Sequence, residues 1–130
     1  MKTLAALIIV LSVASMSATS RPEFGQAMTQ ADKARNSAEG RKYAQPLAVA
    51  MKDIYSTGIR CVPLPPTRDS YFTIIFYLAA DGSVERVLEW TPSSTTRCFV
   101  QVLRGKKFPR PPRAHWPVSF GIGEGDIGTR

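Results

Sequence analysis

The chain is poor in the residues that build metal centres and catalytic triads, because its 130 residues include only two cysteines and one histidine. Such counts do not fill a cysteine-rich zinc module, and a single histidine excludes a histidine-based metal cluster within one chain. A Ser-His-Asp triad would depend on His115 as its base, and neither a phosphate-binding loop nor a metal-ligand spacing is present. We therefore expect no metal, no cofactor and no enzymatic activity, and we expect His115 to be a surface or turn residue.

Acidic residues are also scarce, with 10 aspartates and glutamates against 17 lysines and arginines, which gives a net charge of +7. Aromatic residues make up 9% and hydrophobic residues 44% of the chain. These fractions exclude a disordered acidic protein and a low-complexity protein. The length is that of one domain.

The first twenty residues have the layout of a signal peptide. Lys2 precedes an apolar run over residues 4–13, and small residues follow it. The run is shorter than the roughly 20 residues that a membrane-spanning helix needs. We expect residues 1–20 to be a cleaved signal peptide, with an uncleaved anchor as the alternative. Export would place the rest of the chain in an oxidising compartment.

Cys61 and Cys98 have no other cysteine to pair with in such a compartment. We therefore predict that they form a disulfide, with a stabilisation of about 4 kcal/mol from the entropy of the closed loop. The alternative is one buried free thiol and one reactive thiol. No Cys-x-x-Cys spacing supports that alternative.

The helical patterns begin with a polar, alanine-rich lead-in over residues 21–45. It either packs as a helix or remains mobile, because Asn36, Ser37 and Gly40 interrupt it. A clearer helix is predicted over residues 46–55, with a proline in its first turn. Its apolar face consists of Leu47, Ala50, Met51 and Ile54.

Residues 71–79 are rich in aromatic and β-branched side chains that alternate between two faces, which predicts a strand. Asp81 and Gly82 predict a turn, after which a second strand begins at Val84. The apolar alternation breaks at residues 85–86, which predicts a β-bulge. Glu85 and Glu89 are expected to face solvent or to form ion pairs.

A second helix is predicted from a serine cap at residues 93–94 to Gly105. Residues 116–122 predict a third strand, and Pro117 indicates that this position begins the strand or lies at a sheet edge. Stiff extended segments are predicted over residues 61–66 and 106–112, and a flexible tail over 123–130. The order predicts an α+β fold, a three-stranded antiparallel sheet with a β-β-α-β core and helices on one face.

Residues 71–122 resemble the TonB C-terminal-like domains. The shared features are the alternating strand before Asp81-Gly82, two valines spaced by three at positions 84 and 87, the Ser93-Ser94 helix start, the Phe108–Pro111 element and a closing strand. The resemblance implies a periplasmic location in Gram-negative bacteria and binding of short protein segments. The sequence lacks the long proline-rich spacer of the energy-transducing members, so we do not expect energy transduction.

One candidate binding surface is the second face of the sheet. If it is uncovered, it would be an apolar and aromatic patch of the kind that binds partners. Alternatively, residues 21–57 fold over it and make it core. The residues of this face are Tyr71, Ile75, Tyr77, Leu88 and Trp90.

A second candidate is a basic run interleaved with Phe108 and Trp116. Export argues against nucleic acid and favours an acidic protein surface, anionic lipid or lipopolysaccharide. A solvated face is the alternative. The basic residues are Arg104, Lys106, Lys107, Arg110 and Arg113.

A third candidate is the edge strand 116–122, which could pair with a partner strand or with a second copy of the chain, although Pro117 disfavours pairing at one end of it.

We therefore expect an exported, periplasmic protein-binding or adaptor domain that docks a partner segment on its sheet surface or edge. The alternative is a periplasmic immunity or inhibitor protein that neutralises a secreted toxic hydrolase. Its partner would then be an acidic enzyme or toxin surface. Neither function requires nucleic acid, a metal or a cofactor.

Overall fold

The computed structural model describes residues 20–123. The predicted signal peptide, apart from Ser20, and the predicted tail, apart from Gly123, lie outside the described residues. The elements in chain order are α1 (Arg21–Asn36), α2 (Ala38–Gly58), η1 (Ile59–Cys61), η2 (Arg68–Ser70), β1 (Phe72–Leu78), β2 (Val84–Glu89), α3 (Ser94–Arg104) and β3 (Trp116–Ile122).

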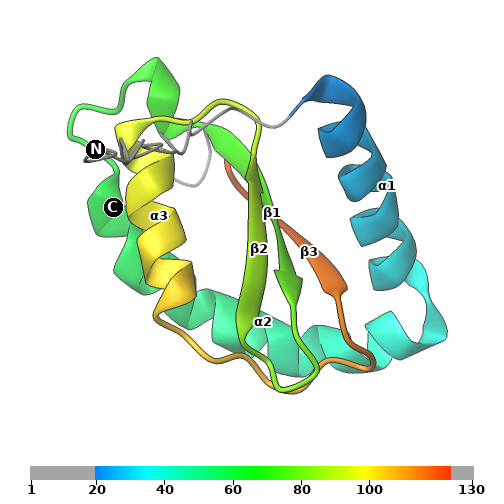
Figure 1. The fold of residues 1–130 in the computed structure, drawn as a ribbon. Coiled ribbons are helices and arrows are strands. Elements are labelled where there is room, and N and C mark those ends of the chain that lie inside the picture. Colours follow the sequence, from blue (N-terminus) through cyan, green and yellow to red (C-terminus); the bar gives the residue numbers. More distant parts are fainter. Residues whose placement is uncertain (1–19, 124–130) are drawn as a thin grey trace, which may run out of the picture.

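The strands form an antiparallel sheet in the order β2-β1-β3, and α3 lies between β2 and β3 in the chain. This confirms the predicted α+β fold and its β-β-α-β order. Ile75 of the central strand pairs with Leu88 on one side and Ser119 on the other. The expectation that all helices cover one face of the sheet is wrong, because α1 packs on the face opposite α2 and α3. Figure 1 shows the strands in the middle, α3 on the left, α1 on the right, and α2 crossing behind the lower end of the sheet.

The hairpin between β1 and β2 contains the predicted bulge. Leu78 pairs with Val84, whereas the preceding Tyr77 pairs with Arg86, so Glu85 is the extra residue. The bulge explains why the apolar alternation of the sequence shifts here by one position.

The turn of this hairpin depends on Gly82, which has a φ of 90°. A side chain is disfavoured in that conformation, and a β-carbon would also overlap the carbonyl oxygen of Phe108. The Asp81 carboxylate accepts hydrogen bonds from the backbone N–H and the hydroxyl of Ser83, at 3.0 and 2.6 Å. These bonds hold the pKa of Asp81 below its usual value.

The lead-in of residues 21–45 is helical. Ser20 caps α1 by accepting a hydrogen bond from the backbone N–H of Glu23 at 3.4 Å. Ser37 ends α1 and also caps α2, because its hydroxyl accepts from the backbone N–H of Gly40 at 3.0 Å. The predicted interruption is therefore a one-residue break between two helices.

The helix predicted over residues 46–55 in fact begins at Ala38, so its predicted start is wrong. It ends at Gly58, three residues beyond the predicted end. Pro46 lies inside α2, a position that costs about 3 kcal/mol in an isolated helix. Contacts made by the first turns of α2 must offset this cost.

Tyr43 supplies those contacts. Its ring meets Trp116 edge to face, with centroids 6.0 Å apart, and its hydroxyl donates to the carbonyl oxygen of Pro109 at 2.7 Å. Burial of a large side chain contributes about 1.5–3 kcal/mol and a hydrogen bond about 1 kcal/mol.

Gly40 allows α2 to approach α1, because a β-carbon there would overlap the carbonyl oxygen of Ala34.

The core lies on both faces of the sheet. The larger part separates the sheet from α2 and α3, and its fully buried side chains include Ile54, Ile74, Phe76, Leu78, Leu103 and Trp116. On the other face, α1 presents mainly alanines, whose small side chains let it approach the sheet closely. The buried residues there are Ala27, Ile75 and Leu88. Phe24 and Met28 of α1 add larger side chains to this layer.

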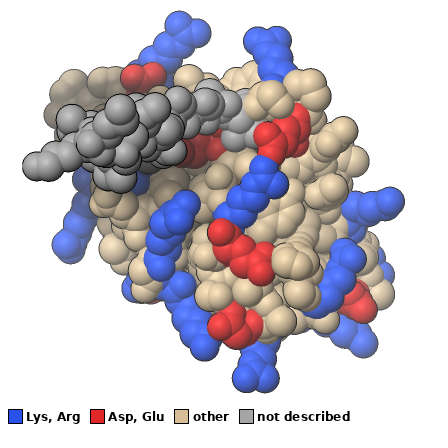
Figure 2. Space-filling view, in the orientation of Figure 1, with Lys and Arg blue, Asp and Glu red and all other residues tan. Residues whose placement is uncertain are grey.

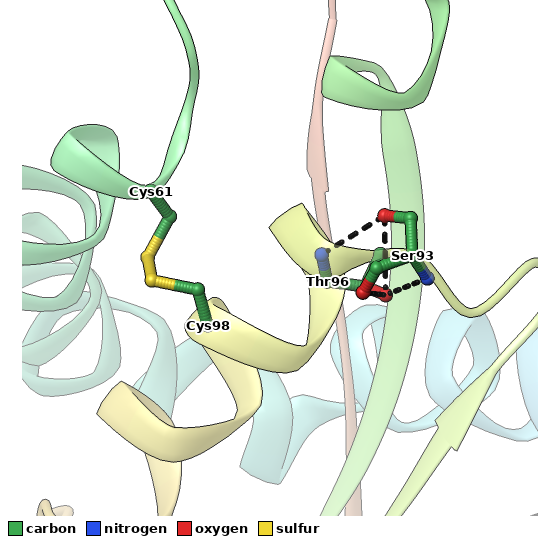
Figure 3. The surroundings of a disulfide bond; sticks show 4 residues. All are labelled: Cys61, Ser93, Thr96 and Cys98. Atoms are coloured by element: carbon green, nitrogen blue, oxygen red, sulfur yellow. Dashed lines mark hydrogen bonds between the residues drawn. A yellow bond between two sulfur atoms is a disulfide. The ribbon is translucent and has the colours of Figure 1, made fainter.

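A disulfide joins Cys61 of η1 to Cys98 of α3 (Figure 3). The two Cα atoms are 5.6 Å apart. This confirms the predicted pair. Cys61 itself belongs to a 3₁₀ turn, so the predicted extended segment begins only at Val62. Nearby, the predicted serine cap is confirmed, because Ser93 and Thr96 cap the start of α3 with reciprocal hydrogen bonds.

Within residues 20–123, no helix has both the length and the apolar character that a membrane crossing requires.

Candidate binding groove

The second face of the sheet is mostly covered. Ile75 and Leu88 are 0% and 4% exposed beneath Ala27 of α1. These two residues are therefore core and not an accessible surface, which corrects the expectation of an open patch. The alternative, in which residues 21–57 fold over this face, is correct for α1 alone, because Leu47, Met51 and Ile54 of α2 pack with the core on the opposite face.

The three aromatic residues of the same face have different surroundings. Tyr77 is half-buried, and its hydroxyl donates to the side-chain oxygen of Gln30 at 3.1 Å. Burial raises the pKa of Tyr77. Tyr71 and Trp90 stay 39% and 38% exposed, beyond the sheet's contact with the middle of α1.

The predicted basic run is only partly free. Lys106 forms an ion pair with Asp53 of α2 at 2.8 Å, and the guanidinium of Arg113 lies over the ring of Trp116 at 5.2 Å. Trp116 itself is 2% exposed and belongs to the core. The remaining members of the run, Arg104, Lys107 and Arg110, are exposed.

Figure 2 shows one face of the molecule, on which basic side chains lie both at the outline and across the middle, with acidic side chains among them. On this face the charge is dispersed. On this face the charges therefore do not mark one basic patch.

Both sheet edges carry protective features. The edge strand predicted at residues 116–122 is β3, and α1 packs closely beside it. The opposite edge is β2, where the bulged Glu85 pairs with His115 at 2.7 Å and Arg86 pairs with Glu23 of α1. Bulges and charges of this kind disfavour pairing with another strand.

The Glu85 carboxylate forms a hydrogen bond with the imidazole of His115, one of the two kinds of surroundings expected for Glu85 when that imidazole is protonated. Glu89 differs, because one of its carboxylate oxygens is buried without a hydrogen-bond partner among residues 20–123. Nothing in the structure explains this buried oxygen.

An apolar groove of about 250 Å³ lies where α1, α2 and β3 meet; we call it the α2–β3 groove. Trp116, Val118 and Phe120 of β3 form one wall and Leu47 and Met51 of α2 form the other. The other lining residues are Ala31, Arg35, Gly40, Tyr43, Ala44, Ala48, Pro117 and Ser119.

The polar groups of the groove are few. The Tyr43 hydroxyl already donates to Pro109, and burial raises its pKa to about 12, so it stays neutral at physiological pH. Arg35 lies at the groove and pairs with the exposed Asp32 at 2.9 Å. Ser119 supplies a hydroxyl. A largely apolar pocket with a few polar groups is the usual form of a binding site.

A larger and more polar cleft, of about 470 Å³, lies between α1 and β2 and is lined in part by Glu85 and His115. His115 has a φ of 56°, a conformation uncommon for residues other than glycine. Its side chain is 77% exposed, however, so its imidazole is in contact with bulk water. The hydrogen bond to Glu85 orients the imidazole ring, but the residues lining the cleft include no serine, threonine or cysteine that this ring could activate.

The groove joins residues that the sequence analysis assigned to separate elements. Leu47 and Met51 were recognised as an apolar helix face, and Trp116 was included among the candidate binding residues. Ala44 and Ala48 were missed. The available signal was their spacing of four, which places Ala44 and Ala48 beside Leu47 and Met51 on one side of a helix. Small side chains next to large ones leave a depression in the surface of a helix.

No protein-family model matches the chain, and no curated protein or solved structure matches it significantly. The resemblance of residues 71–122 to TonB C-terminal-like domains therefore stays a prediction from sequence.

Proposed function

We propose that this chain is an exported protein-binding domain that holds an apolar side chain of a partner segment in the α2–β3 groove. The observation that supports this most is the groove itself, along which Leu47, Met51 and Phe120 are only partly buried. Burying one large apolar side chain there would contribute about 1.5–3 kcal/mol. Affinity would also need contacts from the residues that flank this anchor.

Charge indicates the chemistry of those flanking residues. The chain has a net charge of +7, and Arg35 lies at the groove. We infer that the partner segment carries acidic residues beside its apolar anchor. The disulfide supports an oxidising, extracytoplasmic location, in which segments of envelope proteins and secreted enzymes are both present.

The inhibitor function uses the same surface and differs in the identity of the partner. An adaptor would hold an envelope protein without altering an activity. An inhibitor would abolish the activity of the enzyme whose acidic surface it covers. The groove and the net positive charge fit both, so the partner's own activity in the complex distinguishes them.

The test is selection of binding peptides from a displayed random library, followed by measurement of their affinities. We expect the selected peptides to share a large apolar residue next to acidic residues. Ala48→Met should fill the groove and weaken binding at least about tenfold, since loss of one buried anchor costs about 1.5–3 kcal/mol. Ala48 is exposed at the rim, so this variant should fold normally.

Val49→Met is the matched control, because Val49 is 68% exposed and does not line the groove. It should leave the affinity unchanged. Peptides without a shared apolar anchor, or equal binding by the Ala48→Met and Val49→Met variants, would contradict the proposal.

A further inference from the structure

A second cleft, of about 440 Å³, lies at the end of the sheet where β1 begins and β2 ends; we call it the aromatic cleft. Tyr71 and Trp90 line it, and they are two of the most exposed large hydrophobic side chains of residues 20–123, at 39% and 38%. The cleft is separate from the α2–β3 groove, and the two share no lining residue. Partly exposed aromatic rings beside a cleft offer flat apolar surface to a ligand.

The polar side chains of the cleft have free hydrogen-bonding capacity. Arg68, Asp69, Thr73 and Thr91 also line it. Within the described part of the chain, none of these four side chains makes a hydrogen bond or an ion pair. By contrast, the acidic and basic residues of the His115 cleft are paired with one another. The aromatic cleft thus presents donors and acceptors that a ligand can satisfy without breaking an existing bond.

The cleft is held in shape by its supports. Thr67 and Ser70 close a capped turn around Arg68 and Asp69, with the Thr67 backbone N–H donating to the Ser70 hydroxyl at 3.0 Å. Ser70 is fully buried, so this turn is fixed to the body of the domain. A fixed backbone turn limits where the Arg68 and Asp69 side chains can lie, which lowers the entropy cost of binding a ligand there.

The Trp90 ring is held in a similar way. It packs against Phe24 with centroids 5.4 Å apart, and the Arg21 guanidinium lies over it at 5.2 Å. Both supporting residues belong to the first turns of α1. The ring keeps its partial exposure despite these two contacts.

We propose that the aromatic cleft binds a saccharide made of pyranose rings. The negative face of an aromatic ring attracts the weakly positive C–H groups on the flat side of a pyranose. A sugar hydroxyl both donates and accepts, so adjacent hydroxyls can satisfy the Asp69 carboxylate and the Arg68 guanidinium together. The threonine hydroxyls extend the same pattern.

Other ligand classes fit this set less well. An apolar side chain would leave Arg68 and Asp69 unsatisfied, which costs affinity when both are covered. A phosphate-bearing chain would pair with Arg68 but would meet the like charge of Asp69. A polyol satisfies both charges and also uses both rings.

The experiment is calorimetric titration of the whole exported domain with chitotriose, maltotriose and cellotriose. We expect saturable binding of at least one of them. Tryptophan emission should change in parallel, because Trp90 is exposed whereas Trp116 is 2% exposed. No binding of any of the three sugars would overturn the proposal.

Asp69→Asn locates the site. Asp69 is exposed and has no side-chain partner among residues 20–123, so the variant should keep the wild-type melting temperature. It should weaken binding about tenfold, which is the effect of losing one charge-assisted hydrogen bond. Glu39→Gln, an exposed change on α2 away from the cleft, is the matched control and should bind like wild type. Equal affinity of the Asp69→Asn variant and wild type would overturn the assignment to this cleft.

The Ala48→Met variant separates this proposal from the proposed function. It fills the α2–β3 groove and should leave sugar binding unchanged, because the aromatic cleft has other lining residues. Loss of sugar binding in that variant would contradict a saccharide site in the aromatic cleft.

Discussion

Removing the disulfide should destabilise the domain by about 4 kcal/mol. The change is the double substitution Cys61→Ala/Cys98→Ala. The two cysteines are 37 positions apart in the chain. A cross-link across a loop of that length lowers the entropy of the unfolded chain by an amount equivalent to about 4 kcal/mol. A small domain has a total stability of about 5–15 kcal/mol, so the loss is a large part of it.

The structure indicates which contacts loosen first. The disulfide joins η1 to α3 beside a small buried cluster of Val62, Phe99 and Ile122. This cluster is separate from the larger core around Phe76 and Trp116. Without the cross-link, the segment from η1 to η2 is held mainly by that small cluster, so we expect faster hydrogen exchange there than in β1.

The assay is urea denaturation followed by circular dichroism. The midpoint of the variant should fall by about 2–3 M relative to wild type, given a typical dependence on urea for a domain of this size. Wild-type protein measured with a reducing agent should match the variant. A loss below about 1 kcal/mol, or a reducing agent without effect on wild type, would refute the stabilising role assigned to this bond.

Three further predictions concern single residues. Tyr43→Phe should cost about 1 kcal/mol at neutral pH through loss of the hydrogen bond to Pro109. Folding raises the pKa of Tyr43 to about 12, so between pH 10 and pH 12 the unfolded chain loses the Tyr43 proton more readily than the folded domain does. The free energy of unfolding of wild type should therefore fall over this range by about 2 kcal/mol more than that of Tyr43→Phe. Urea titrations at each pH measure both. Gly82→Ala should cost about 2–4 kcal/mol, since the turn has a φ of 90° and a β-carbon would overlap the Phe108 carbonyl; a midpoint equal to that of wild type would count against this account of the turn. Ser93→Ala should cost about 1 kcal/mol in the same assay through loss of the α3 cap, whereas Ser94→Ala, which keeps the cap, should cost less.

The sheet and α3 could be predicted because their signals are local. The glycine turn, the valine spacing that reveals the bulge at Glu85, and the serine cap at Ser93 each depend on a few adjacent residues. The structure confirms all three. The disulfide was predictable for a different reason, since elimination left Cys61 and Cys98 a single way to pair.

The N-terminal half was harder to predict because its signals are weak or depend on tertiary contacts. The buried face of α1 consists of Ala27, Ala31 and Ala34, which give little contrast with its exposed face. α2 continues through Pro46 because Tyr43 is anchored to residues far along the chain. No periodicity in residues 38–46 reveals such an anchor.

The candidate sites were predictable only in part. Tyr71 and Trp90 stay exposed, whereas Ile75 and Leu88 are covered, because the alanines of α1 approach the middle of the sheet and not its end. The basic run loses part of its free charge to Asp53, which lies on another helix. The α2–β3 groove depends on how α2 crosses β3, and sequence patterns carry no information about that crossing.

The most direct test of the central claim is a nuclear magnetic resonance titration with a peptide selected by this domain. The methyl resonances of Leu47, Met51 and Val118, which line the α2–β3 groove, should shift and saturate together. Those of Leu64 and Val49, which are 70% and 68% exposed outside the groove, should stay in place. Shifts confined to resonances outside the groove would contradict the claim that this groove holds the partner.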